Sequence, residues 1–123
     1  MISSGLACGW RAILRGKPRI CGADRQDPGP VMSLHETADF RVPFRLEQGY
    51  RRRVENAGNS HLLVQRAVRW PAHCGIENGV REVAFDDLVA WIENGVKPAG
   101  DDVLGDVSRL GLRWTPRRHP KDP

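Results

Sequence analysis

The apolar residues of this chain form two short continuous runs and two helical stripes between residues 31 and 95. The first run, VMSLH at residues 31–35, follows a turn rich in Pro and Gly, and the second, LLVQRAV at residues 62–68, follows Gly-Asn-Ser. Continuous apolar runs of this length are typical of strands buried on both faces of a parallel sheet, although a short piece of a core helix has the same pattern. The flanking turn residues favour strands at both places.

A first helical stripe lies between the two runs. Leu46, Tyr50 and Val54 recur at every fourth position within residues 44–56, while charged residues occupy the other positions. Gly58 follows as a stop signal. The pattern therefore predicts an amphipathic helix that joins two strands.

A second and wider stripe runs through residues 78–95, where Gly95 is a stop signal and Pro98 prevents continuation. A stripe of this width indicates a helix packed on the sheet, with Trp91 and Phe85 in the core. The apolar positions of the stripe are Val80, Val83, Ala84, Phe85, Leu88, Val89, Trp91 and Ile92.

The two ends of the chain lack this regularity. Residues 1–30 are interrupted by Gly and Pro every few positions, and only Trp10 to Leu14 has room for a helical turn. The last part is polar, with one weak apolar stretch at residues 110–114 and a basic, Pro-rich end. We therefore expect an irregular N-terminal segment over 1–30, an α/β segment over 31–102 and a mobile basic tail over 103–123.

Two residues with acid–base chemistry follow the predicted strands. A strand, a helix and a strand in this order form a right-handed crossover, so both strands are expected to be parallel and to end at one edge of the sheet. Asp39 follows the first strand and His73 the second. A catalytic His needs a carboxylate on one ring nitrogen and a nucleophile's proton on the other. Asp39 and His73 are thus candidates for an acid and a base, with a turn or helix-capping Asp and a solvated loop His as the alternatives.

The charge and the Cys and His content limit the kinds of ligand that the chain is expected to bind. The net charge is +4 and the pI is about 9.4, which permits weak attraction to anions. We interpret the cluster at residues 51–53 as the solvated face of the first helix, with an anion-binding patch as the alternative. The 3 Cys and 4 His have neither zinc-site nor disulfide-framework spacing, so no metal and no cofactor is expected.

Membrane and export signals are also missing from the pattern. No apolar run approaches the roughly 20 residues that a membrane-spanning helix needs. No basic segment followed by an apolar core opens the chain, so no export signal is recognised and a cytoplasmic location is expected by default.

Three segments, PVMSLHETADFRVPF, LLVQRAVRWPAHCG and AFDDLVAWIENGVKPAGD, resemble the C-terminal part of bacterial α/β-hydrolases of the esterase or lipase kind. The resemblance covers about residues 30–102. In that family the acid follows the penultimate core strand, often as D-x-x-V-P, and Asp39 with Val42 and Pro43 matches this pattern. The resemblance implies a partial, C-terminal βαβα segment of a mostly parallel three-layer sheet.

The family's catalytic His follows the last strand, often as Gly-His-Cys. His73 and Cys74 match this pattern, while Ala72 stands in place of the Gly. The helix that follows commonly carries F-x-D-L-x-x-W before a Gly and a Pro, and the same order occurs here at Phe85, Asp87, Leu88, Trp91, Gly95 and Pro98. The resemblance implies that Asp39 is the acid and His73 the general base of a catalytic triad.

The nucleophile of that family stands in a Gly-x-Ser-x-Gly turn before the acid and the base. No such turn occurs in this chain, and neither Cys8 nor Cys21 lies in a Gly-x-Cys-x-Gly frame. The serines are Ser3, Ser4, Ser33, Ser60 and Ser108. We therefore expect no nucleophile, and a C-terminal fragment of a carboxylic-ester hydrolase that is inactive alone.

Partners follow from the same reasoning. Two strands leave sheet edges uncovered, so the expected partner is the missing N-terminal part of the hydrolase or a separate chain. The alternative is a small α/β module that binds a partner and has no catalytic activity. A third hypothesis, a nucleic-acid binder that uses residues 51–53 and the basic tail, is disfavoured because the positive charge is modest.

Overall fold

A computed structural model describes residues 29–116, so the possible turn at Trp10 to Leu14 and the last residues of the basic tail lie outside the described part. The elements in chain order are β1 (Val31–Glu36), α2 (Arg45–Asn56), the short 3₁₀ helix η2 (Ser60–Leu62), β2 (Leu63–Val68), α3 (Asn78–Asn94) and the short 3₁₀ helix η3 (Val107–Arg109). Both predicted strands and both predicted helices form, and each end lies within one residue of its predicted place.

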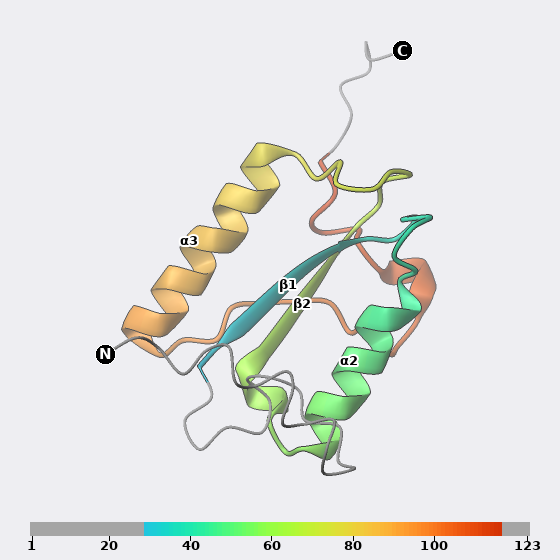
Figure 1. Cartoon of the computed structure of the whole chain (residues 1–123). Helices are drawn as coiled ribbons and strands as arrows, with labels where there is room; N and C mark the ends of the chain where they lie inside the picture. The colour runs from blue at the N-terminus through green and yellow to red at the C-terminus, as the bar shows by residue number, and fades with distance from the viewer. Residues whose placement is uncertain (1–28, 117–123) are drawn as a thin grey trace, which may run out of the picture.

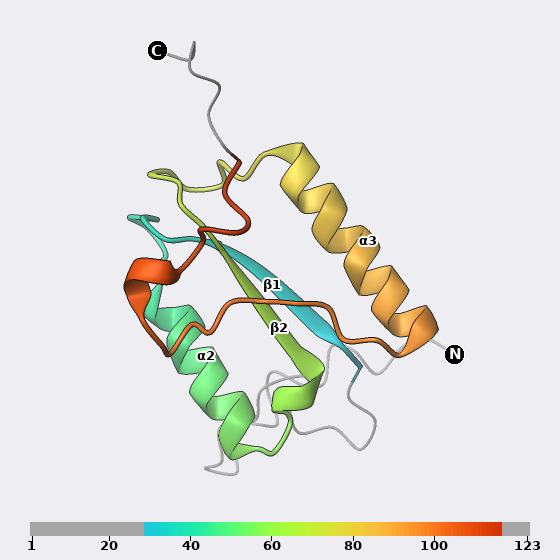
Figure 2. The same cartoon turned by 180° about the vertical axis from the view of Figure 1, so that it is seen from behind.

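The two strands of the described region pair in parallel, with Val31 opposite Leu63 and Glu36 opposite Val68. Helices α2 and α3 lie on opposite sides of this sheet, which makes a small three-layer α/β arrangement (Figures 1 and 2). Because the strands are parallel and in register, they end at the same edge. The predicted α/β class is therefore confirmed for this region, at the level of a partial fold.

The side of the sheet under α2 holds a small apolar core. Val54 of the helix packs against Leu63 of β2, and each is 2% exposed. Val31 and Tyr50 extend this core. Leu46, which belongs to the predicted apolar stripe, is 55% exposed, because it lies in the first turn of α2, two turns away from the Val54 cluster.

The side under α3 contains less apolar contact than the sequence pattern predicts. Ala84 and Trp91 are buried, but Phe85 is 65% exposed and Ile92 is 62% exposed. The prediction that Phe85 lies in the core was therefore wrong. Successive residues of a helix are about 100° apart, so a stripe this wide spans more of the helix than a sheet of two strands can cover.

The free edge of β2 is covered by the chain that follows α3. The amide of Asp101 donates to the carbonyl of Gln65 at 2.7 Å, and the amide of Ala67 donates to the Asp101 carboxylate at 2.7 Å. Gly100 permits this approach, because a Cβ there would lie 2.8 Å from the Gln65 carbonyl oxygen. All six residues of β2 are consequently buried, whereas most of β1 is half-buried.

The packed part of the chain extends past residue 102, where the sequence pattern placed the start of a tail. Val103 is 2% exposed and Leu110 is 5% exposed, and both pack against Ala67 of β2. Figure 2 shows this segment crossing the strands after it leaves α3. Residues 103–116 are therefore part of the fold.

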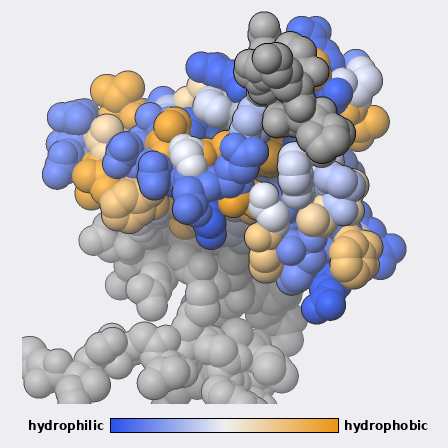
Figure 3. Space-filling model, turned by 90° about the horizontal axis from the view of Figure 1, so that it is seen from above, coloured by the Kyte–Doolittle hydropathy of each residue, from blue (hydrophilic) through white to orange (hydrophobic). Residues whose placement is uncertain are grey.

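The charged and apolar surfaces alternate at the end of the sheet where both strands finish. Figure 3 shows hydrophobic side chains there in separate patches between hydrophilic ones.

No helix within residues 29–116 is long and apolar enough to cross a membrane.

Candidate acid–base site

The parallel register brings the two candidate residues to one edge of the sheet. β1 ends at Glu36 and β2 at Val68, and the amide of Thr37 still donates to the Val68 carbonyl at 2.8 Å. The chain then leaves the sheet in two loops, one carrying Asp39 and the other His73. Residues 34 apart in the sequence are thereby placed side by side.

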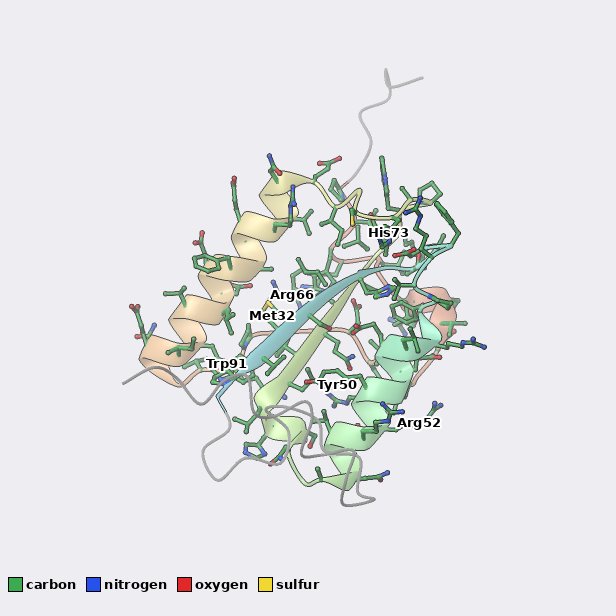
Figure 4. All side chains as sticks on the ribbon, viewed as in Figure 1. Met32, Tyr50, Arg52, Arg66, His73 and Trp91 are labelled. Atoms are coloured by element: carbon green, nitrogen blue, oxygen red, sulfur yellow. The ribbon has the colours of Figure 1, made fainter. Side chains whose placement is uncertain are left out.

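The structure places Nδ1 of His73 2.7 Å from Oδ2 of Asp39. The Asp39 side chain is 6% exposed and the His73 side chain 32% exposed, so the acid lies beneath the ring. Figure 4 shows His73 beyond the end of the strands, on the loop after β2. Both residues predicted from the sequence are therefore adjacent, while their catalytic roles stay predictions.

Asp39 also stabilises a backbone turn, which was the alternative to a catalytic role for this residue. Its Oδ1 accepts hydrogen bonds from the backbone amides of Arg41 at 2.8 Å and Val42 at 3.0 Å. These bonds hold one carboxylate oxygen in place and direct the other toward His73. The turn and the contact with His73 thus use different oxygens of one side chain.

Burial raises the pKa of Asp39, but hydrogen bonds from Val42, His73 and Arg41 lower it more, so the pKa falls from 3.8 to about 2. At neutral pH the carboxylate is ionised and only accepts hydrogen bonds. Nδ1 of His73 must therefore carry the proton that it shares with Asp39. This arrangement leaves the lone pair of Nε2 free in the neutral ring, as a general base requires.

The loop that carries His73 is held by the strand that precedes Asp39. Glu36, which is 3% exposed, accepts a hydrogen bond from the backbone amide of Gly75. A Cβ at Gly75 would lie 2.4 Å from Nε1 of Trp70, so only glycine fits. Cys74, which lies between His73 and Gly75, has a φ of 63°, a left-handed conformation that is uncommon for any residue except glycine. The hydrogen bond to Glu36, the tight fit at Gly75 and the φ of Cys74 together define the backbone conformation of the loop next to His73.

Within residues 29–116 no serine hydroxyl is hydrogen-bonded to His73, and the free thiol of Cys74 is exposed next to it in the chain. The hydroxyl of Ser33 donates to Glu47 at 2.6 Å under α2, and Ser60 and Ser108 lie in the two short 3₁₀ helices. The hydrogen bond between His73 and Asp39 uses Nδ1 of the ring. The Asp39–His73 pair can move a proton, while the absence of a nucleophile stays a prediction.

An open depression of about 350 Å³ lies between the loops that carry the pair. Ala38 and Thr37 come from the Asp39 loop, Pro71 from the His73 loop, and Leu110 from the C-terminal segment. No group of three or more His, Cys, Asp or Glu side chains in the described residues is arranged to hold a metal ion.

Two buried polar residues, of which only Glu36 contacts the loops of this site, were not predicted from the sequence. Glu36 ends an otherwise apolar strand, and Arg66 lies inside the apolar run of β2, where it is 3% exposed. Its guanidinium forms an ion pair with Asp87 of α3 at 2.5 Å. A charged residue within a buried strand is itself a signal, because such groups are buried only with a partner.

The comparisons with known proteins give one distant relationship. No family model matches the chain, and no solved structure matches it. The chain is similar to an o-phthalyl amidase of Xanthobacter agilis, with 23% identity over 86 residues, which make up 67% of this chain and 19% of that protein. The chain thus spans about a fifth of the length of its relative. The similarity supports a relationship to hydrolases, and the α/β-hydrolase family itself is not shown.

Proposed function

We propose that this chain is the acid–base segment of a serine hydrolase that cleaves carboxylic esters or amides, with Asp39 orienting His73 and His73 acting as the general base. The 2.7 Å contact between Nδ1 of His73 and an ionised Asp39 supports this proposal. The similarity to an amidase supports the reaction class, since esters and amides are cleaved by the same acyl-transfer chemistry.

In this proposal the nucleophile belongs to another segment or chain. His73 takes the proton of that nucleophile on Nε2 as the nucleophile attacks the acyl carbon, and returns it to the leaving alcohol or amine. Asp39 stabilises the imidazolium that exists between these two transfers. The chain alone forms no acyl-enzyme and is inactive.

The experiment that tests the role of the pair is a nitrogen NMR measurement of the tautomer of His73 in the full chain. The proposal requires the proton on Nδ1 of the neutral ring and a bare Nε2. The variant Asp39→Asn removes the charged acceptor and is expected to change the tautomer. A neutral ring with its proton on Nε2 in the unaltered chain contradicts the proposal, because that nitrogen could not accept a proton.

A second function, a partner-binding module without catalysis, is favoured by a different observation. In the described residues β1 pairs only with β2 on one side, and the adjacent helix α3 leaves Phe85 and Ile92 exposed. Unpaired strand edges and exposed apolar side chains are the features of a surface that another polypeptide covers. A partner that binds the His73→Gln variant as tightly as it binds the unaltered chain would favour this function.

A further inference from the structure

A second cavity, of about 410 Å³, lies between the start of α3 and the C-terminal segment at residues 113–116. Neither Asp39 nor His73 lines it. Figure 4 shows Arg66 directed from β2 toward the α3 side of the sheet, where this cavity lies. The cavity is therefore separate from the acid–base pair and has a chemistry of its own.

Trp114 provides an unused hydrogen-bond donor at this cavity. Its Nε1 is buried and has no hydrogen-bond partner. Buried indole N–H groups usually find an acceptor, and an unpaired one points to a missing partner. The indole thus provides a donor for a ligand that brings an oxygen acceptor.

Two guanidinium groups lie beside the same indole ring. The central carbon of Arg66 is 3.8 Å from the ring centroid and that of Arg113 is 4.7 Å from it. Arg66 is fixed, because it donates to the carbonyl of Ala99 at 3.0 Å and pairs with Asp87. Asp87 balances the charge of Arg66, whereas Arg113 has no ion pair within residues 29–116. The unbalanced charge at this wall is therefore positive.

The remaining lining is mixed. Val80 and Val83 of α3 are apolar, whereas Glu77 and Thr115 are polar. A phosphate dianion is disfavoured, because the carboxylate of Glu77 in the lining repels a double negative charge more than a single one. A flat apolar body with one carboxylate satisfies both the walls and the donors, since arginine binds carboxylates through two parallel hydrogen bonds.

We infer that this cavity binds a small aromatic carboxylate. The carboxylate accepts from Arg113 and, once the atoms that cover the buried Nε1 of Trp114 move aside, from the indole as well. Arg66 holds the indole in position, and the aromatic body lies against Val80 and Val83. Glu77, an exposed residue of the lining, carries the opposite sign and weakens the binding of any anion. The inference is independent of the proposed function, because it uses none of the groups of the acid–base pair.

The test is a titration of the ¹⁵N-labelled full chain with benzoate, followed by the indole N–H signal of Trp114. The variant Trp114→Phe assigns that signal and keeps the aromatic wall. We expect a saturable shift with benzoate. Arg113→Gln is expected to weaken binding about 10-fold through loss of a charged hydrogen bond, and Trp114→Phe, followed by the amides of Gly79 and Val80, is expected to weaken it less.

Matched controls separate a site from general attraction to a basic protein. Arg109→Gln removes the same charge from an exposed residue of η3 that does not line the cavity, and it is expected to leave the affinity unchanged. Glu77→Gln is expected to tighten binding. Benzamide, which lacks the charge, should produce no saturable shift.

Three outcomes would overturn the inference. The first is a Trp114 signal that does not respond to benzoate, and the second is an equal loss of affinity in Arg113→Gln and Arg109→Gln. The third is inorganic phosphate binding as tightly as benzoate, which would mean that the site selects charge alone. Dispersed amide spectra of each variant show that the fold is retained, so that each outcome refers to the cavity.

Discussion

The carboxylate of Glu36 accepts a hydrogen bond from the backbone amide of Gly75, and this contact joins the end of β1 to the loop that follows β2. Asp39 lies in the loop that directly follows β1, and His73 precedes Gly75 by two residues. The same strand end therefore positions both members of the acid–base pair. A buried carboxylate that holds a loop in this way acts on His73 through the backbone.

Substitution of Gly75 by Ala should separate the pair. The new Cβ would lie 2.4 Å from Nε1 of Trp70 and 3.0 Å from Oε1 of Glu36, so the loop has to move. We expect a loss of about 1–3 kcal/mol in the free energy of unfolding, as for other overpacked sites, together with a change in the His73 tautomer measured by NMR. Gly79→Ala is the control, because its Cβ meets nothing within 4 Å. Equal effects of the two variants would show that the Glu36 contact is unimportant.

Asp39 should make stability depend on pH in the acid range. Its pKa is lowered from 3.8 to about 2 in the folded chain, so the unfolded chain binds a proton first as the pH falls. The stabilisation is complete above the unfolded pKa and is lost as the pH falls toward the folded value. Denaturant unfolding between neutral pH and pH 2 checks this, and Asp39→Asn should remove that part of the pH dependence. An unchanged profile in Asp39→Asn would be the contrary result.

The isolated chain should not hydrolyse esters by a His73-dependent route. No serine hydroxyl is hydrogen-bonded to His73 in the described residues, so p-nitrophenyl acetate should be cleaved only at the slow rate of exposed imidazole and thiol groups, Cys74 included. His73→Gln and His61→Gln are therefore expected to have equal small effects, since His61 is an exposed residue outside the site. Turnover abolished by the first substitution and kept by the second would contradict the proposed function.

Packing of the C-terminal segment should contribute measurably to stability. Val103 is 2% exposed and packs on Ala67, so Val103→Ala is expected to cost about 1–3 kcal/mol in the free energy of unfolding. Val107→Ala serves as the control, because Val107 is 64% exposed, and its effect should stay within about 0.5 kcal/mol. Chemical denaturation measures both. A neutral Val103→Ala would mean that this segment does not belong to the cooperative unit.

The surface along β1 and α3, which nothing else in residues 29–116 covers, should make folding depend on concentration if the chain needs a partner. Phe85 and Ile92 are exposed on the helix beside the open strand, and a second copy can stand in for the partner at high concentration. Thermal unfolding over a roughly 100-fold range of concentration should then give a rising midpoint. A midpoint that does not move would argue against the partner-binding module.

The sequence predicts the strands, the helices and the Asp39–His73 contact because each depends on a local signal. Runs of apolar residues, turn residues and the handedness of a crossover are enough to place two loops at one edge. The burial of Val103 and Leu110 is not predictable in this way. Val103 has only Leu104 as an apolar neighbour, and Leu110 begins a weak apolar stretch with no clear period. Their burial depends on the close approach of Gly100 and Gly111 to β2.

The wrong placement of Phe85 has a related cause. Its position in the apolar stripe of α3 shows that it can be buried, whereas the width of the neighbouring sheet decides whether it is. The ion pair between Arg66 and Asp87 depends in the same way on the packing of α3 over β2. Hydrophobic periodicity describes one helix or strand at a time, whereas each of these contacts joins two elements.

The segment that follows α3 closes one side of the sheet. Asp101 occupies the hydrogen-bonding groups of Gln65 and Ala67 that would otherwise receive another strand. Among residues 29–116, only β1 therefore keeps a strand edge at which this sheet can grow. Any strand recruited to enlarge it arrives on the Asp39 side of the pair, with His73 kept on the margin of the enlarged sheet.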